Sequence, residues 1–153
     1  MISLNHLYWI ANLWALCGWL VLFFYFALPV RMVRFAGIFM PLGLALAYLC
    51  AVIFALPLFS GGFGSLESLG QLYQHPVAVL VGWIHYLAFD LFIGGWQVRR
   101  AQSIGLPVVV VVPCLLLTLL FGPIGLLVFY MLQKWWPSND QVSDPPDVWG
   151  SGR

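Results

Sequence analysis

Charged side chains are scarce in this sequence. Asp, Glu, Lys and Arg make up 7% of the 153 residues, whereas 63% are hydrophobic, and the mean hydropathy is +0.97. A soluble domain usually carries about a quarter charged residues, so this composition indicates a membrane protein. The net charge is only +1 and forms no concentrated basic face, which excludes nucleic acid as a partner.

Paired cysteines and a targeting leader are also missing. Cys17, Cys50 and Cys114 lie far apart within apolar runs, where a thiol packs as a small hydrophobic side chain. Without a Cys-x-x-Cys pair we expect no metal site, and no other cofactor is indicated. The first apolar run has no basic segment before it and is too long for a signal-peptide core. We therefore expect it to be retained, in a bacterial-type inner (plasma) membrane.

Long hydrophobic runs are abundant instead. Four windows are each long enough to cross the roughly 30 Å hydrocarbon core of a bilayer. They lie near residues 7–30, 36–59, 76–98 and 106–132. The sequence thus predicts an all-α, multi-pass membrane protein with four transmembrane helices in a single domain, residues 1–136. The polar residues 137–153, rich in Pro and Asp, are predicted to form a disordered tail.

The basic residues predict an orientation for these helices. Four arginines lie in the first and third connections: Arg31, Arg34, Arg99 and Arg100. The positive-inside rule then places both termini on the extracytoplasmic side, with Lys134 and Arg153 as exceptions.

The second connection predicts a short amphipathic helix at the membrane surface. Leu66, Leu69 and Tyr73 recur at helical spacing, polar residues lie between them, and Ser65 is suited to cap the first turn. The helix serves either as an interfacial connector, which we favour, or as a binding site for a partner.

Three polar residues occur within six positions of the third span: His85, Tyr86 and Asp90. An ionisable side chain at bilayer depth costs roughly 3 kcal/mol, so its presence indicates a partner or a function. Each residue of a helix turns by about 100°, which places Trp83, Tyr86, Asp90, Gly94 and Gln97 on one stripe. His85 lies on another side, so His85 and Asp90 need partners from other helices.

Depth in the membrane suggests those partners. Asn12 in the first span matches His85, whereas Tyr86 and Thr118 match Asp90. For Asn12, Tyr86 and Thr118 we favour the alternative, in which they merely hold helices together by hydrogen bonds or packing. Pro123, within the run FGPIG, predicts a kink in the last span, which either improves packing or shapes a ligand cleft.

Three short motifs are distinctive in combination. They are Trp83-x-His85, then Asp90-Leu91-Phe92, and finally Gly122-Pro123-x-Gly125. This combination resembles the abscisic-acid-deficient-four family of neoxanthin synthase-like membrane proteins, in which the position of Gly95 is usually basic. The resemblance implies a role in xanthophyll formation, where a 5,6-epoxide is opened to an allene. Such an isomerisation needs an acid and a base, roles that His85 and Asp90 would supply.

Two functions of different classes follow. In the first, the protein binds and isomerises a carotenoid or related isoprenoid in a cleft between spans one, three and four. The residues that would contact the substrate there are Asn12, Trp83, Tyr86, Thr118 and Pro123. In the second, it is a noncatalytic subunit or assembly factor, packed against a photosynthetic or pigment-synthesising membrane complex or against its own copies. Transport is a third class, but no internal repeat is evident. The sequence alone leaves open whether the protein is an enzyme.

Overall fold

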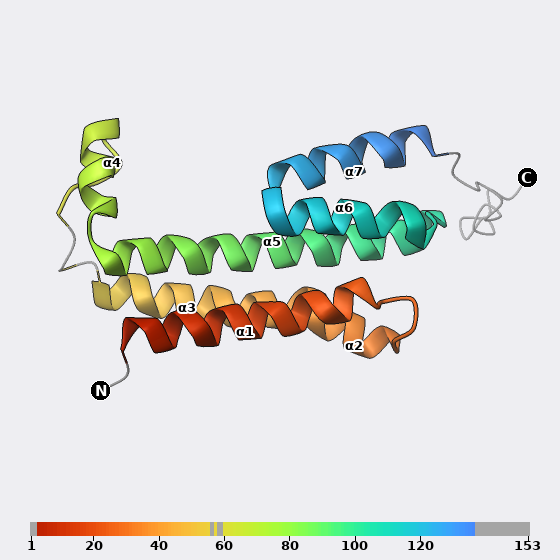
Figure 1. The fold of residues 1–153 in the computed structure, drawn as a ribbon, viewed down its shortest axis with the longest axis horizontal. Coiled ribbons are helices and arrows are strands. Elements are labelled where there is room, and N and C mark those ends of the chain that lie inside the picture. Colours follow the sequence, from red (N-terminus) through yellow and green to blue (C-terminus); the bar gives the residue numbers. More distant parts are fainter. Residues whose placement is uncertain (1–2, 56, 58–59, 137–153) are drawn as a thin grey trace, which may run out of the picture.

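The computed structural model describes residues 3–55, 57 and 60–136, and this part of the chain consists of helices joined by turns and loops, without a strand (Figure 1). Three segments are long and apolar enough to cross a membrane. They are α1 (Leu4–Phe23), the continuous run of α2 (Val30–Arg34), the π-helical segment η1 (Phe35–Phe39) and α3 (Met40–Ala55), and α5 (Pro76–Ile104). The prediction of an all-α protein with apolar spans is confirmed. The predicted tail, residues 137–153, lies outside the described residues.

Local sequence signals fix where these helices begin and end. The Ser3 side chain accepts a hydrogen bond from the His6 backbone N–H, which caps the first turn of α1. Pro76 occupies the first position of α5, where its missing N–H costs nothing. Gly105 ends α5 in the left-handed conformation with φ +69°, which only glycine adopts without strain. The spans are therefore bounded by chemistry as well as by hydropathy.

The predicted surface helix is present as α4 (Leu66–Tyr73), and the Ser65 side chain caps it by accepting from the Ser68 N–H. Figure 1 shows α4 lying across one end of the bundle rather than along it. Tyr73 packs on Gly82 at the start of α5, where an added Cβ would lie 3.1 Å from the phenol ring. This contact joins the connection to the bundle.

Helix α5 is the central element of the bundle, with α1 and α3 on one side and α6 (Val108–Phe121) on the other (Figure 1). Glycines let the neighbours approach closely. The backbone of Gly95 touches that of Gly37 in η1, and a Cβ at Gly94 would lie 2.7 Å from the Trp19 indole. A long basic side chain at position 95 would not fit this contact. Instead, Arg99 Nη1 donates to the Gly37 carbonyl at 3.2 Å.

The continuous fourth span predicted over residues 106–132 is not present. The chain turns back at Gly122, which has φ +25° and separates the 14-residue α6 from the 13-residue α7 (Pro123–Trp135). Each arm is only about 20 Å long, too short for the hydrocarbon core. Arg100 Nε donates to Gln133 Oε1 at 3.1 Å, so α7 returns to the end of the bundle at which α6 begins. We call this pair of arms the hairpin.

The hairpin changes where the described chain ends. The first turn of α1 and the last turn of α7 lie at opposite ends of the bundle in Figure 1, whereas four spans would bring both termini to one side. Lys134 consequently joins the arginines of the first and third connections. Lys134 is then no longer an exception to the positive-inside rule, as it was with four spans.

Candidate functional site

Three residues of the polar stripe of α5, namely Tyr86, Asp90 and Gln97, face the hairpin, and Gln97 connects the stripe to both arms. Its Oε1 atom accepts a hydrogen bond from Thr118 Oγ1 of α6 at 3.0 Å, and its Nε2 atom donates to the Gly125 carbonyl of α7 at 3.2 Å. Gln97 and Thr118 are both fully buried. The sequence analysis placed Gln97 on the polar stripe but did not identify it as a site residue. A single glutamine side chain belongs to no recognisable motif.

Tyr86 binds the hairpin near its tip. Its hydroxyl donates to the Leu119 carbonyl at 3.0 Å. Leu119 lies in the last turn of α6, where the carbonyls have no partner within the helix because the chain turns back at Gly122. Tyr86 therefore supplies a hydrogen bond to the end of α6, directly before the turn that Pro123 follows.

Asp90 lies directly against the tip of the hairpin, midway along α5. Its side chain is 6% exposed, and Gly122 is its neighbour: an added Cβ there would lie 2.7 Å from Oδ1. The Tyr86 hydroxyl is adjacent, one helical turn earlier. Among the described residues, however, Oδ2 has no hydrogen-bond partner. A buried carboxyl oxygen without a partner is costly, which marks Asp90 as the residue of the stripe that is not explained by packing.

The stripe continues from Tyr86 toward the α4 end of the bundle through aromatic rings. Trp83 stacks on Tyr86 with ring centroids 5.2 Å apart, and its Nε1 donates to Asn12 Oδ1 of α1 at 3.2 Å. Tyr8 lies on the other side of Trp83 and lines a shallow depression of about 280 Å³. Asn12, Trp83, Tyr86 and Asp90 thus form one connected series.

His85 stands apart from this series. Its ring contacts Tyr48 of α3 and Phe89, with centroids 5.3 and 4.6 Å away, and the residue is exposed. The pairing with Asn12 expected from depth is not formed, because Asn12 bonds to Tyr8 and Trp83. The structure therefore connects Asn12, Trp83, Tyr86 and Asp90 in one series, places Thr118 and Pro123 beside that series in the hairpin, and leaves His85 on another side of α5.

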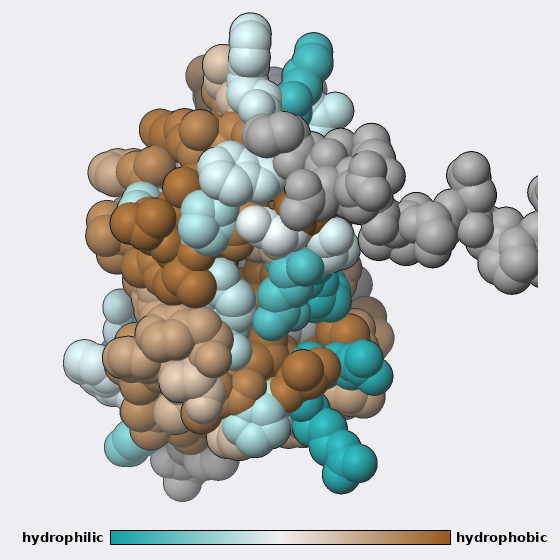
Figure 2. All heavy atoms as spheres, turned by 90° about the vertical axis from the view of Figure 1, so that its right-hand side faces the viewer, coloured by the Kyte–Doolittle hydropathy of each residue, from teal (hydrophilic) through white to brown (hydrophobic). Residues whose placement is uncertain are grey.

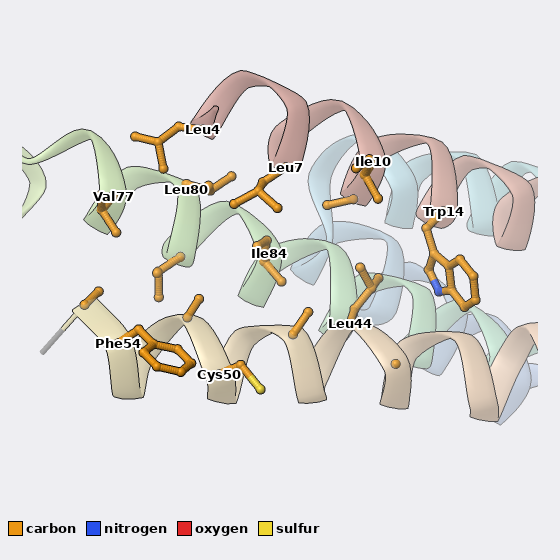
Figure 3. A pocket seen from close by; sticks show the side chains of 16 residues that line it. Leu4, Leu7, Ile10, Trp14, Leu44, Cys50, Phe54, Val77, Leu80 and Ile84 are labelled. Carbon is orange, nitrogen blue, oxygen red and sulfur yellow. The ribbon is translucent and has the colours of Figure 1, made fainter. Parts of the chain in front are cut away.

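A second feature is an apolar cleft of about 690 Å³ between α1, α3 and α5, at the end of the bundle that carries α4 (Figure 3). Leu7 and Ile10 of α1, Leu80 and Ile84 of α5, and Cys50 and Phe54 of α3 point into it. The sequence placed a cleft between spans one, three and four instead. The sequence feature that corresponds to the observed cleft is a series of small residues spaced four apart, which leaves space on one face of α3: Gly43, Ala47, Ala51 and Ala55.

No group of three His, Cys, Asp or Glu side chains suited to hold a metal ion occurs among the residues that the structure describes. Asp90 and the cleft are therefore the two features that carry a functional interpretation. Asp90 offers a free carboxyl oxygen in a polar setting, and the cleft offers apolar volume. Trp83, Tyr86 and Asp90 point to one side of α5 and the cleft residues to another.

Comparisons with known proteins give one match. No curated protein and no solved structure matches the chain. The ABA4-like family, described as ABA DEFICIENT 4-like, matches over residues 6–129, a range that contains the three motifs and all seven predicted site residues. The chain belongs to the ABA4-like family, as its motifs predicted.

Proposed function

We propose that this protein binds an isoprenoid of the carotenoid class, with the hydrocarbon chain in the apolar cleft between α1, α3 and α5, and that it does so in a bacterial-type inner membrane. The cleft is the observation that carries the proposal: about 690 Å³ of space with an apolar lining, a volume typical of ligand sites. Membership of the ABA4-like family supports the ligand class. The three apolar spans support the membrane location.

The cleft is long enough to hold a section of a polyene. The α1 residues that line it run from Leu4 to Trp14, which is about 15 Å of helix. The side chains of α1, α3 and α5 present mainly carbon surface along that length, which suits a hydrocarbon chain. Trp14, whose Nε1 donates to the Met40 carbonyl, lies at one end of the cleft and offers an aromatic face for stacking.

Space-filling variants test this proposal. Ala47→Trp and Ala51→Trp place an indole in the cleft, whereas Ala45→Trp makes the same change on an exposed part of α3 that does not line it. The protein is purified from a pigment-producing host, and its visible spectrum and extracted pigments are measured. We expect near-stoichiometric polyene with the unchanged protein and with Ala45→Trp, and at least a tenfold loss with the other two.

A protein that is colourless and comigrates with a large assembly would refute the binding proposal and favour the role of a noncatalytic subunit. Equal pigment in all three variants would place the ligand outside the cleft.

Isomerisation is a second proposal, supported by Asp90. It is separate from binding in the cleft, because Asp90 lies on another side of α5 and a substrate would have to bind against the stripe to reach it. Opening an epoxide needs an acid at its oxygen and a base for a neighbouring proton, and the free Oδ2 beside the Tyr86 hydroxyl provides a group able to carry that proton. His85 lies on a different side of α5, so the chemistry is assigned to Asp90 alone.

The variant Asp90→Asn keeps the size and much of the hydrogen bonding of the side chain but cannot exchange a proton. In a knockout strain complemented with this variant, we expect normal protein level and a pigment profile that lacks the isomerised product. Full complementation would leave Asp90 as packing. Because the stripe and the cleft occupy different sides of α5, pigment binding should survive this change, and the two proposals fail independently.

A further inference from the structure

The end of the bundle opposite α4 collects positive charge. It contains every Lys and Arg of the described residues, namely Arg31, Arg34, Arg99, Arg100 and Lys134. The two acidic residues of the described chain lie elsewhere, Glu67 in α4 at the opposite end and Asp90 midway along α5. We call these five cationic residues the basic end. Figure 2 views this end of the molecule, and hydrophilic side chains gather on one side of it beside apolar ones.

Not all five cations are available to a ligand. The Arg99 guanidinium is committed to the bundle, since it donates to the Gly37 carbonyl and lies 6.0 Å from the centre of the Phe92 ring. Arg31, Arg34, Arg100 and Lys134 are exposed. The bond from Arg100 to Gln133 holds the last turn of α7 against α5, and so places Lys134 at this end. The hairpin is therefore what adds the fourth exposed cation.

The surroundings of these cations place them at the level of lipid headgroups. They lie where the apolar spans end, next to Trp135, which is 82% exposed, and Phe35, which is 51% exposed. Exposed aromatic rings together with Lys and Arg are typical of the membrane interface. The cations come from three separate helices, a distribution that suits a layer of headgroups better than one small ion.

We infer that the basic end binds the phosphate groups of anionic phospholipids, at a site separate from the cleft and from the stripe. Guanidinium and ammonium groups form charge-assisted hydrogen bonds with phosphate oxygens, and no described carboxylate at this end neutralises them. The negative surface of the cytoplasmic leaflet attracts such a cluster, and by the positive-inside rule the basic end faces the cytoplasm. The charge complementarity therefore selects anionic lipids of that leaflet.

Quenching by brominated lipids tests the inference on the full-length protein in neutral detergent. Brominated phosphatidylglycerol or phosphatidylcholine with identical acyl chains is titrated while tryptophan fluorescence is followed. We expect phosphatidylglycerol to quench at a concentration at least tenfold lower. This preference should fall sharply at about 0.5 M NaCl, where charges are screened beyond a few ångströms. Equal quenching by both lipids would overturn the inference.

Charge-removing variants locate the site. Arg31→Gln, Arg34→Gln and Lys134→Gln combined should leave only the contribution of Arg100 and lower the preference by about fivefold per cation removed. Glu67→Gln alters one charge at the opposite end and should leave it unchanged. Should the triple variant fail to fold by circular dichroism, Lys134→Gln alone decides the matter. Loss with Glu67→Gln, or none with a folded basic-end variant, would contradict the inference.

Two further experiments distinguish anionic lipid from other sources of negative charge. Inorganic phosphate at the concentration of the lipid should not displace phosphatidylglycerol, and displacement would indicate a soluble anion site instead. A variant ending at Trp136 lacks Asp140, Asp144 and Asp147 of the tail. It should show the same preference as the full chain. A preference that appears only after this truncation would mean that the tail, not lipid, occupies the basic end.

Discussion

The two sides of α5 are held by different kinds of contact. On the side of α1 and α3, α5 is held by close packing at glycines: Gly95 lies against Gly37, and Gly94 lies under the Trp19 indole. Toward the hairpin the contact is polar, through Gln97 and Tyr86. Lipid is as apolar as the helices, so apolar burial gives no force that keeps a helix beside its neighbour. Full-length spans are kept in place by the membrane itself, whereas an arm of half that length depends on specific bonds.

The largest expected effect is in a test of topology, which asks whether the hairpin crosses the membrane and therefore gives an all-or-none result. Single cysteines are placed by Gly64→Cys, Ser103→Cys and Trp135→Cys in a background without other cysteines. A membrane-impermeant maleimide applied to intact cells should label position 64 and leave positions 103 and 135 unlabelled. Labelling at 64 and 135 together would show that residues 106–132 cross the membrane after all. Permeabilised cells, in which all three positions should react, serve as the control.

The contact between Gly95 and Gly37 should be the largest single contribution to stability. Gly95→Leu forces η1 away from α5, because backbone rather than a flexible side chain blocks the added atoms. We expect the free energy of unfolding to fall by about 3 kcal/mol, measured by SDS titration with circular dichroism. Gly70→Leu in α4, where nothing lies near an added Cβ, is the matched control. A loss below about 0.5 kcal/mol at position 95 would contradict the close contact.

Removing the amide that joins both arms of the hairpin should have a smaller and more local effect. Gln97→Leu keeps the volume but deletes two interhelical hydrogen bonds, worth about 1 kcal/mol together. Cys114 of α6, 1% exposed, reports on the hairpin directly. In a background with Cys17→Ser and Cys50→Ser, its maleimide labelling should accelerate about fivefold as the hairpin opens. An unchanged labelling rate would mean that the hairpin is held by other contacts.

The smallest expected effect concerns Tyr86. Tyr86→Phe deletes the bond to the Leu119 carbonyl and should cost about 0.6 kcal/mol of unfolding free energy. The same change in a Pro123→Ala background should cost equally much, because the restored N–H at position 123 belongs to the first turn of α7, beyond the turn at Gly122. A double-mutant cycle measures the difference between the two costs. A cost that vanishes in the Pro123→Ala background would show that the restored N–H reaches the Leu119 carbonyl.

Much of the site followed from the rotation of a helix. A turn of 100° per residue placed Tyr86, Asp90 and Gln97 on one side and His85 on another, as the structure has them. The contact between Asn12 and Trp83 could not be predicted in this way, because the rotation of one helix relative to another depends on the side chains between them. Depth alone matched Asn12 with His85.

The hairpin and the cleft could not be predicted in the same way. A hydropathy window does not distinguish one 27-residue span from two short arms, because both are apolar throughout; the Gly122–Pro123 pair predicted a kink but not its size. The series that begins at Gly43 and Ala47 normally predicts close helix packing. Here α1 stays away and a cleft remains, an arrangement determined by contacts elsewhere in the bundle.

The π-helical segment η1 acts as a rotational offset for everything that follows it in α3. It widens the turn over Phe35–Phe39, so the face that α3 presents further along is shifted relative to a regular helix. The small residues from Gly43 to Ala55 line the cleft in a helix that carries this shift. The orientation of a cleft wall at one end of the bundle therefore depends on a backbone distortion at the other. Converting η1 to regular α-helix at the same chain length would turn this wall away by about 100° without altering any residue that lines the cleft.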